Sequence, residues 1–390
     1  IFVSCIGFLI LSVPGVMQHS FTIKPKDYPA EIAFWGGYGI NDTNQLQELN
    51  EHETTLITCC YGNLSDEDQK DEFIRFFTRI RDDYPGISYF LSITSKPGLF
   101  VWDGNTEEII EYSKKVISII QEHDLTLIKR LAYDIELPYF PHFGYMPEEY
   151  DASPNKERHA AALESWHEFS EWSALNAPDL QLNSINYAES SVDVFDGDDD
   201  LQRIKKYSFL DFDGDYFDEY ATMSYRSFYF GKKPYGASTE NPLMRYLDGG
   251  HYWIYNELKL TAEALERKFG THEKLGIYLG ITNCSFYSAD YAQYQNGKPA
   301  GKGFDSLVRD ALIAKHFGVK RITIFLLDTV IENGYSMGGA FDSYGENFLD
   351  RFNESINGKE STKPFKIWYK PRLNPIFTPF LTFGHLDYFV

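Results

Sequence analysis

The stretch that decides the fold is Ile128-Lys129-Arg130-Leu131-Ala132-Tyr133-Asp134-Ile135-Glu136, and Pro138 stops it. A short, largely apolar run that ends before a proline is typical of a buried strand. Similar runs recur from Glu31 to about Phe352 and alternate with segments of helical periodicity. Because helices are the usual connections between parallel strands, this alternation predicts a parallel sheet.

Eight strands are expected in this region, at residues 31–35, 54–60, 87–94, 128–136, 180–187, 219–225, 275–280 and 321–328. Helical periodicity predicts one helix that begins at the capping box Ser65-Asp66-Glu67-Asp68 and a second that begins near Thr106. A third helix contains Trp166, and a fourth covers 304–317. Eight strand and helix units that close once form a (β/α)8 TIM barrel of the α/β class, in which function gathers on the loops after the strands. The strand ends expected at one rim are Trp35, Tyr61, Thr94, Glu136, Tyr187, Tyr225, Gly280 and Asp328.

The two ends of the chain lie outside the barrel pattern. Residues 1–17 carry no charge, and about 17 residues is the lower limit of a membrane span. We therefore expect a membrane anchor or signal remnant at 1–17, a linker at 18–30, the barrel at 31–358 and a C-terminal extension at 359–390. Proline and aromatic residues in the extension, as in Pro375-Ile376-Phe377-Thr378-Pro379-Phe380, fit a segment packed on the barrel or lying at a membrane interface.

Four possible glycan acceptors point to the cellular location. Asn-x-Ser/Thr tripeptides begin at Asn41, Asn63, Asn283 and Asn353. Such tripeptides accept N-linked glycans when a chain faces a lumen or the outside. Together with the apolar start, they predict a membrane-anchored glycoprotein whose barrel is extracellular or lumenal.

Composition restricts the partners. Lys and Arg number 36 against 57 Asp and Glu, and the net charge of −21 repels phosphate backbones, so nucleic acid is not an expected partner. Aromatic residues make up 17% of the chain, which favours stacking on the faces of sugars. The four cysteines have no zinc-site spacing, and the acidic run at 193–200 is interpreted as a surface loop and not a calcium site. No metal is expected, although a second acidic run at Asp211, Asp213, Asp215 and Asp218 leaves a bound cation as the alternative. Phosphate-binding and dinucleotide-binding glycine motifs are not found, and no cofactor is expected.

Two acidic residues end the fourth expected strand. Because side chains alternate along a strand, Ala132, Asp134 and Glu136 share one face, and Tyr133 and Ile135 share the other. Repulsion between two carboxylates and loss of solvent raise the pKa of one of them. A carboxylic acid that stays protonated near neutral pH is what a glycosidase needs to protonate a leaving oxygen. A solvated or arginine-paired acidic pair is the alternative interpretation.

These residues resemble motifs of glycoside hydrolase family 18, which comprises chitinases, endo-N-acetylglucosaminidases and chitinase-like lectins. The family's fourth strand ends in Asp-x-x-Asp-x-Asp-x-Glu, and Asp134-Ile135-Glu136 matches the last three positions. Its sixth-strand motif, Met-x-Tyr-Asp, is matched in part by Met223-Ser224-Tyr225-Arg226. Weaker matches are Phe90-Leu91-Ser92-Ile93 and Lys274-Leu275-Gly276-Ile277-Tyr278-Leu279-Gly280 on the third and seventh strands.

The resemblance implies a glycoside hydrolase that acts on a glycan containing N-acetylhexosamine, by substrate-assisted retaining hydrolysis. Glu136 would be the general acid that becomes the general base, and Asp134 would orient and stabilise the N-acetyl group of the substrate as that group attacks the anomeric carbon. Tyr225 would donate a hydrogen bond to the acetyl oxygen. The candidate sugar contacts near strand ends are Trp35, Tyr61, Asn186, Tyr187, Arg226 and Asp328.

The chain departs from the family pattern at several positions. Lys129 and Ala132 stand where the motif has acids, Arg226 stands where it has Asp, and Leu326-Leu327-Asp328 replaces the usual tryptophan. Loss of an acid at position 132 removes the partner that would hold Asp134 protonated or turn it toward the substrate.

Two alternatives stay open. The first is an ordinary two-carboxylate glycosidase that pairs Glu136 with Asp328 or Glu332, and the distance between the carboxyl groups would show whether it retains or inverts. The second is a catalytically inactive, glycan-binding or structural membrane ectodomain, which Ala132 and Arg226 favour.

Overall fold

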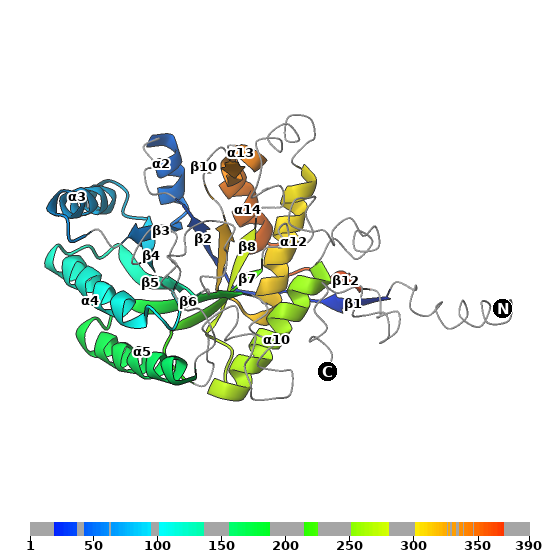
Figure 1. The fold of residues 1–390 in the computed structure, drawn as a ribbon. Helices are drawn as coiled ribbons and strands as arrows, with labels where there is room; N and C mark the ends of the chain where they lie inside the picture. Colours follow the sequence, from blue (N-terminus) through cyan, green and yellow to red (C-terminus); the bar gives the residue numbers. More distant parts are fainter. Residues whose placement is uncertain are drawn as a thin grey trace.

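The computed structural model of the chain describes residues 19–36, 43–61, 64–94, 101–135, 156–187, 214–224, 251–280, 301–325, 327, 330–332, 335–337, 339–345 and 347–369. Within these residues, eight parallel strands close into one barrel, and each strand pairs with its neighbours in the sequence (Figure 1). The last strand pairs with the first, which completes the ring. The barrel strands are β2 (Glu31–Trp35), β3 (Thr55–Tyr61), β4 (Ser88–Thr94), β5 (Ile128–Asp134), β6 (Gln181–Tyr187), β7 (Glu219–Ser224), β8 (Leu275–Gly280) and β9 (Arg321–Phe325).

The strand boundaries confirm the expected barrel to within a few residues. The fourth expected strand ends as β5 at Asp134, and Ile135 adds one bridge to Val101. The eighth is described as β9 up to Phe325. Strand ends that the sequence placed at one rim, Trp35, Tyr61, Thr94, Tyr187 and Gly280, all end parallel strands of the same barrel.

Helices surround this ring. They are α2 (Thr43–Glu51), α3 (Glu67–Asp83), α4 (Thr106–Glu122), α5 (Lys156–Asn176), α10 (His251–Phe269), α12 (Gly301–Phe317), α13 (Ala340–Tyr344) and α14 (Phe348–Asn357). The expected capping box needs a correction, because Asp66 and not Ser65 caps α3: its carboxylate accepts hydrogen bonds from the backbone N–H groups of Asp68 and Gln69. A carboxylate at a helix N-terminus also interacts favourably with the helix dipole.

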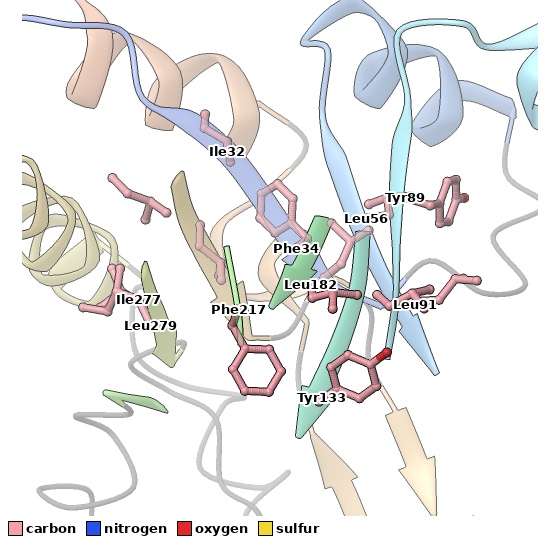
Figure 2. Packing of buried hydrophobic residues seen from close by; sticks show 14 of the residues in the cluster. Ile32, Phe34, Leu56, Tyr89, Leu91, Tyr133, Leu182, Phe217, Ile277 and Leu279 are labelled. Atoms are coloured by element: carbon pink, nitrogen blue, oxygen red, sulfur yellow. The ribbon is translucent and has the colours of Figure 1, made fainter. Parts of the chain in front are cut away.

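Strand alternation divides the apolar core into two parts. Figure 2 shows the outer part, in which strand side chains such as Phe34, Leu91 and Tyr133 point away from the barrel axis toward the helices. The Tyr133 hydroxyl donates a hydrogen bond to Ser113 Oγ on α4 at 3.0 Å, which fixes this orientation. The inner part fills the barrel and consists of Ala33, Ile57, Phe90, Ala132, Ile185, Ala221, Met223 and Tyr278.

A hydrogen-bonded network closes the amino-terminal end of the barrel. Arg321 donates from Nε to Glu31 at 3.0 Å and from Nη1 to Glu219 at 3.1 Å. Arg130 donates to Asn183 Oδ1 at 3.1 Å, and Asn183 Nδ2 donates to Glu219 at 3.0 Å. Two positive and two negative groups therefore neutralise one another, and within this set Arg321 and Glu219 are buried while Glu31 is partly exposed. We call this set the polar floor; its members are Glu31, Thr55, Arg130, Asn183, Glu219 and Arg321.

Phe90 and Gly276 of the barrel interior pack against the polar floor. Phe90 covers it, with its ring centroid 4.3 Å from the Arg321 guanidinium and 5.0 Å from that of Arg130. Gly276 leaves room for the Glu219 side chain, because a Cβ at position 276 would lie 2.8 Å from its carboxyl group. Burial acts to raise the pKa of Glu31, but the charge of Arg321 and the hydrogen bond from Thr55 outweigh it and hold the pKa below its usual value.

A second, two-stranded sheet lies outside the ring, beside α10 and α12 (Figure 1). It pairs β1 (His19–Ile23) with β12 (Phe365–Tyr369) in antiparallel register. The range expected as a linker, 18–30, thus contains a strand, and that strand pairs with the expected C-terminal extension. A hairpin of β10 (Val330–Glu332) and β11 (Tyr335–Met337) follows β9.

Asn357 fixes the start of the barrel to the end of α14. Its side-chain amide accepts a hydrogen bond from the Ala30 backbone N–H at 2.7 Å and donates one to the Ala30 carbonyl oxygen at 3.0 Å. The same Nδ2 donates to Asn353 Oδ1 at 2.8 Å, so the amide of this possible glycan acceptor is engaged in the fold. The acceptors Asn41, Asn63 and Asn283 lie outside the described residues.

Residues 1–17, the expected anchor, also lie outside the described residues. Among the helices in the described part of the chain, none is long and apolar enough to cross a bilayer.

Candidate active site

Inward-facing side chains at the carboxyl-terminal end of the barrel form the candidate site. Phe90 and Ala132 belong to the inner apolar cluster. Because side chains two residues apart on a strand share a face, Ser92 and Asp134 also face the interior, two residues nearer to the carboxyl-terminal end. We call the group the rim cluster; its members are Trp35, Ser92, Thr94, Asp134, Tyr278 and Phe325.

Aromatic rings line one part of the rim cluster. The Trp35 ring centroid lies 6.2 Å from that of Tyr278 with the planes at 66°, and 6.0 Å from that of Phe325. Trp35 is half-buried, so part of its side chain stays accessible. A tryptophan held by two other rings can offer a rigid apolar surface to the face of a sugar ring.

Asp134 supplies the carboxyl group of the rim cluster. It is the last residue of β5, and its backbone carbonyl accepts a hydrogen bond from the Val101 N–H at 2.9 Å, which fixes the strand end. The residue as a whole is half-buried, but its Oδ1 atom is buried and has no hydrogen-bond partner among the described residues. Burial raises the pKa of Asp134 to about 7. Its carboxyl group can therefore take both the protonated and the ionised form near neutral pH.

Position 132 gives Asp134 no polar partner. Ala132 precedes it on the same face, is fully buried and packs in the inner apolar cluster. The raised pKa of Asp134 therefore comes from loss of solvent and not from an acidic neighbour at position 132.

Three more polar atoms of the rim cluster are buried without a partner among the described residues: Ser92 Oγ, Thr94 Oγ1 and the Tyr278 hydroxyl. Burial holds the pKa of Tyr278 well above its usual value, and the negative charges of Glu219 and Asp134 raise it further. Buried polar groups nearly always have hydrogen-bond partners, so a cluster of unpaired ones marks a place where water or a ligand completes the bonding.

The sequence-derived candidates fall into three groups. Trp35 and Asp134 both end barrel strands, β2 and β5, at the carboxyl-terminal end of the barrel. Asn186 does not join them: it faces outward from β6, is buried, and donates from Nδ2 to Ser184 Oγ at 2.9 Å. Its neighbour Ile185 takes the interior position, so the expectation of a sugar contact at Asn186 does not fit this orientation.

The structure describes the remaining candidate residues in part or not at all. Tyr61 and Tyr187 end β3 and β6, and the structure describes their backbones. Glu332 of the two-carboxylate alternative lies on β10 and is described in the same way. Four candidates lie outside the described residues: Glu136, Tyr225, Arg226 and Asp328.

Tyr278 is a site residue that the sequence analysis did not single out. A signal was present, because Gly276 and Gly280 stand two positions to either side of it on the same face of β8. A glycine within a strand often marks a place where another group approaches closely, and Gly276 makes room for the Glu219 side chain on the same face as Tyr278.

A metal site is not visible in the described part of the chain, where no group of three or more His, Cys, Asp or Glu side chains could hold an ion. Two acids of the second acidic run have protein partners. Asp215 pairs with Lys274, and Asp218 Oδ2 accepts a hydrogen bond from the Leu182 N–H at 2.8 Å.

No protein-family model matches the chain, and no curated protein matches it either. Solved structures do. A GH5_18 variant from Bifidobacterium longum subsp. longum, in complex with Manb1-4GlcNAc, is 10% identical with a TM-score of 0.53, over 86% of this chain and 79% of that one. The GH5-4 broad specificity endoglucanase from Clostridium longisporum is 13% identical with a TM-score of 0.48, over 84% and 88%. The endo-beta-1,4-mannanase from Thermotoga petrophila is 12% identical with a TM-score of 0.46, over 87% and 78%.

These neighbours are glycoside hydrolases with barrel folds. At such low identity the first of them supports the barrel fold of this chain and no finer relationship. None of the three is named as a family 18 protein, so the resemblance to that family rests on the sequence motifs alone.

Proposed function

We propose that the chain is a glycoside hydrolase that acts at the carboxyl-terminal end of its barrel on a glycan containing N-acetylhexosamine. The observation that carries the proposal is the Asp134 carboxyl group, which faces the interior at the end of β5 and whose buried Oδ1 has no hydrogen-bond partner among the described residues. Function in this fold gathers at that end. Glu136, two residues further on, is assigned the role of general acid and then general base.

The chemistry of Asp134 fits substrate assistance. An acetamido group brings an N–H donor and a carbonyl acceptor to the site, and an ionised Asp134 can accept from the N–H while the carbonyl oxygen attacks the anomeric carbon. A protonated Asp134 can instead donate to the acetyl oxygen. A pKa of about 7 gives access to both forms at neutral pH.

The saccharide ligand is also supported by the rim aromatics and by the fold. Trp35 offers a ring surface next to Tyr278, whose buried hydroxyl has no hydrogen-bond partner among the described residues. Apolar surface with a few convergent polar groups is typical of a small-molecule site. The solved structure of the same fold from Bifidobacterium longum holds a disaccharide that contains an N-acetylhexosamine.

The test is a comparison of acetylated and deacetylated oligosaccharides as substrates. The full chain should cleave N-acetylglucosamine oligomers and leave the deacetylated oligomers intact, because the nucleophile belongs to the substrate. Glu136→Gln should lower kcat by about 10²- to 10⁴-fold, since it keeps the shape of the side chain but removes the titrating group. Glu122→Gln on the exposed face of α4 is the matched control and should leave kcat unchanged. Efficient cleavage of the deacetylated oligomers would reject the mechanism.

Two other outcomes separate the alternatives. A two-carboxylate glycosidase would tolerate loss of the acetyl group and would lose activity on replacement of Asp328 or Glu332. A binding protein would bind the oligomers in calorimetry without turnover, and the burial of Ala132 in an apolar cluster is the observation that favours it.

A further inference from the structure

The short segment 101–105, which leads into α4, lies against the end of β5. The Val101 backbone N–H donates to the Asp134 carbonyl oxygen at 2.9 Å, and Val101 forms a parallel bridge with Ile135. The Ile135 N–H donates in turn to the Ile185 carbonyl oxygen of β6 at 2.8 Å. Val101 and Ile135 are both fully buried. The end of β5 is therefore held between segment 101–105 and β6.

Hydrogen bonds within segment 101–105 fix its shape. The Trp102 N–H donates to the Asn105 side-chain oxygen at 2.9 Å, and the Asn105 N–H donates back to the Trp102 carbonyl oxygen at 3.2 Å. Thr106 Oγ1 donates to the same carbonyl oxygen at 3.2 Å. Gly104 allows the Trp102 ring to approach closely, because a Cβ at position 104 would collide with that ring. The segment is thus a compact turn at the start of α4.

Arg158, in the first turn of α5, holds this turn from another element. Its Nε donates to Asp103 Oδ1 at 2.9 Å, and its guanidinium carbon lies 5.0 Å from the centroid of a Trp102 ring. The Asp103 side chain is only 10% exposed and that of Arg158 is 24% exposed. A guanidinium that is stacked on a ring and shielded from solvent keeps its geometry better than an exposed ion pair does. One side chain therefore connects the start of α5 to segment 101–105.

Asp134 depends on the position of this strand end for its burial. It is the last residue of β5, and its Oδ1 atom is buried. Burial is the cause that raises its pKa to about 7. The distance by which the strand end can move therefore decides how much solvent reaches the carboxyl group.

We propose that Arg158 is a positioning residue of the candidate site: through Asp103 and Trp102 it holds segment 101–105 against the end of β5, and so keeps the Asp134 carboxyl group turned into the barrel. Arg158 acts without touching the substrate. Rates depend steeply on the placement of reacting groups, and a shift of about 1 Å can cost about 10²-fold. The expected effect on turnover rests on the proposed function, whereas the expected effect on Asp134 does not.

The first test measures the pKa of Asp134 in the full chain. The free energy of unfolding in urea is measured between about pH 4 and about pH 8, with and without Asp134→Asn, and the pH range over which the two curves diverge gives the pKa. In the parent chain this range should extend to about 7. In Arg158→Gln, solvent reaches the carboxyl group, and the range should end nearer to the ordinary value of about 4. Tyr278, the titratable neighbour of Asp134 in the barrel interior, is the same in every chain, so the change reports on Asp134 itself.

Arg81→Gln is the matched control. Arg81 Nε donates to Asp82 Oδ1 at 2.8 Å, which is nearly the geometry of the Arg158 pair. This pair lies in the last turn of α3, shortly before β4 begins, and hence at the amino-terminal end of the barrel. Its loss should leave the pKa of Asp134 as in the parent chain. Asp103→Asn removes the Arg158 ion pair from the other side and should lower the pKa of Asp134 as Arg158→Gln does, which provides a second variant if Arg158→Gln does not fold.

The second test measures turnover of N-acetylglucosamine oligomers. In Arg158→Gln, kcat should fall about 10- to 100-fold, because Asp134 is no longer held in place. KM should change little, since the ring surface of Trp35 on β2 is unaltered. Arg81→Gln should keep both values.

The outcomes separate this inference from the proposed function. An unchanged pKa of Asp134 in Arg158→Gln and in Asp103→Asn would overturn the inference even if both variants lose stability, because Arg158 would then support only the fold. A raised KM with unchanged kcat would also overturn it and would assign Arg158 to substrate binding. Absence of cleavage by the parent chain, together with a lowered pKa in Arg158→Gln, would reject the proposed function and support the inference.

Discussion

The two ends of the barrel carry similar polar side chains but treat them in opposite ways. In the polar floor, Arg130, Arg321, Glu31 and Glu219 find partners among one another. In the rim cluster, buried oxygens of Ser92, Thr94, Asp134 and Tyr278 have none among the described residues. Satisfied polar groups stabilise a fold, and unsatisfied ones reduce its stability unless a ligand completes them. The polar floor therefore stabilises the fold, whereas the rim cluster keeps polar groups that can bind a ligand.

The largest effect is expected from breaking the floor. Arg321→Leu would remove one of the two arginines of the polar floor, and because Arg321 and its partner Glu219 form a buried pair, the loss costs about 3–5 kcal/mol of the free energy of unfolding. Denaturation in urea measures this loss. Lys320→Met is the neighbouring control. Lys320 is exposed and forms a long ion pair of 4.0 Å with the exposed Glu273, and such a surface pair contributes little, so stability should change little. An Arg321→Leu variant as stable as the parent would mean that the floor does not support the barrel.

The second prediction concerns the rim cluster, where a substitution should raise the free energy of unfolding instead of lowering it. The pKa of Asp134 is raised to about 7, so the folded chain holds a proton that the unfolded chain loses near pH 4, and stability falls as pH rises between these two values. Asp134→Asn removes this decline and should be more stable than the parent above pH 7, by at most about 4 kcal/mol. Urea unfolding at pH 5 and pH 8 tests it.

Tyr278→Phe is the control for that experiment. It removes a neighbouring hydroxyl and keeps the carboxyl group, so the pH dependence of stability should remain. Equal pH dependence in Asp134→Asn and in the parent chain would show that the carboxyl group is solvated.

A smaller effect is expected at Gly276, where the floor is tightest. Gly276→Ala adds a Cβ that would lie 2.8 Å from the Glu219 carboxyl group, and such overpacking costs roughly 1–3 kcal/mol. Gly270→Ala is no suitable control, because position 270 has a positive φ of 69°. Thermal unfolding of Gly276→Ala beside Ala221→Gly, which removes a methyl group from the barrel interior, would separate overpacking from loss of packing. An unchanged Tm in Gly276→Ala would show that Glu219 can move.

The smallest effect on stability is expected from the unpaired hydroxyls. Ser92→Ala deletes an oxygen that has no partner among the described residues, so the free energy of unfolding should change by less than about 1 kcal/mol. Saccharide affinity should fall, since the same oxygen is available to a ligand. Thr55→Ala in the floor is the matched comparison, because it removes a hydroxyl that donates to Glu31 at 2.5 Å and should destabilise without affecting affinity. Strong destabilisation by Ser92→Ala would mean that the rim cluster stabilises the fold as the polar floor does.

Much of the barrel could be predicted because its strands are local apolar runs, and the floor and rim follow from alternation along them. The helix α2 was missed, since only Leu46 and Leu49 mark its buried side. Pairing of β1 with β12 joins residues far apart in sequence, and no local pattern reveals such a contact. Alternation from Ile185 would have excluded Asn186 from the interior. That Asp134 Oδ1 has no hydrogen-bond partner in the described part of the chain depends on its surroundings in three dimensions, which a sequence pattern does not contain.

The pairing of His19 with Tyr369 makes the described chain almost circular. Asn357 adds a second link between the two ends of the barrel region, through its two hydrogen bonds to Ala30. In a chain trimmed to residues 19–369, a short linker between these two adjacent positions would cost little closure entropy, and proteins with neighbouring termini tolerate circular permutation. The barrel therefore has no obligatory first strand: a permuted chain that begins at a surface loop between a helix and the next strand, such as the loop between α3 and β4, should still close.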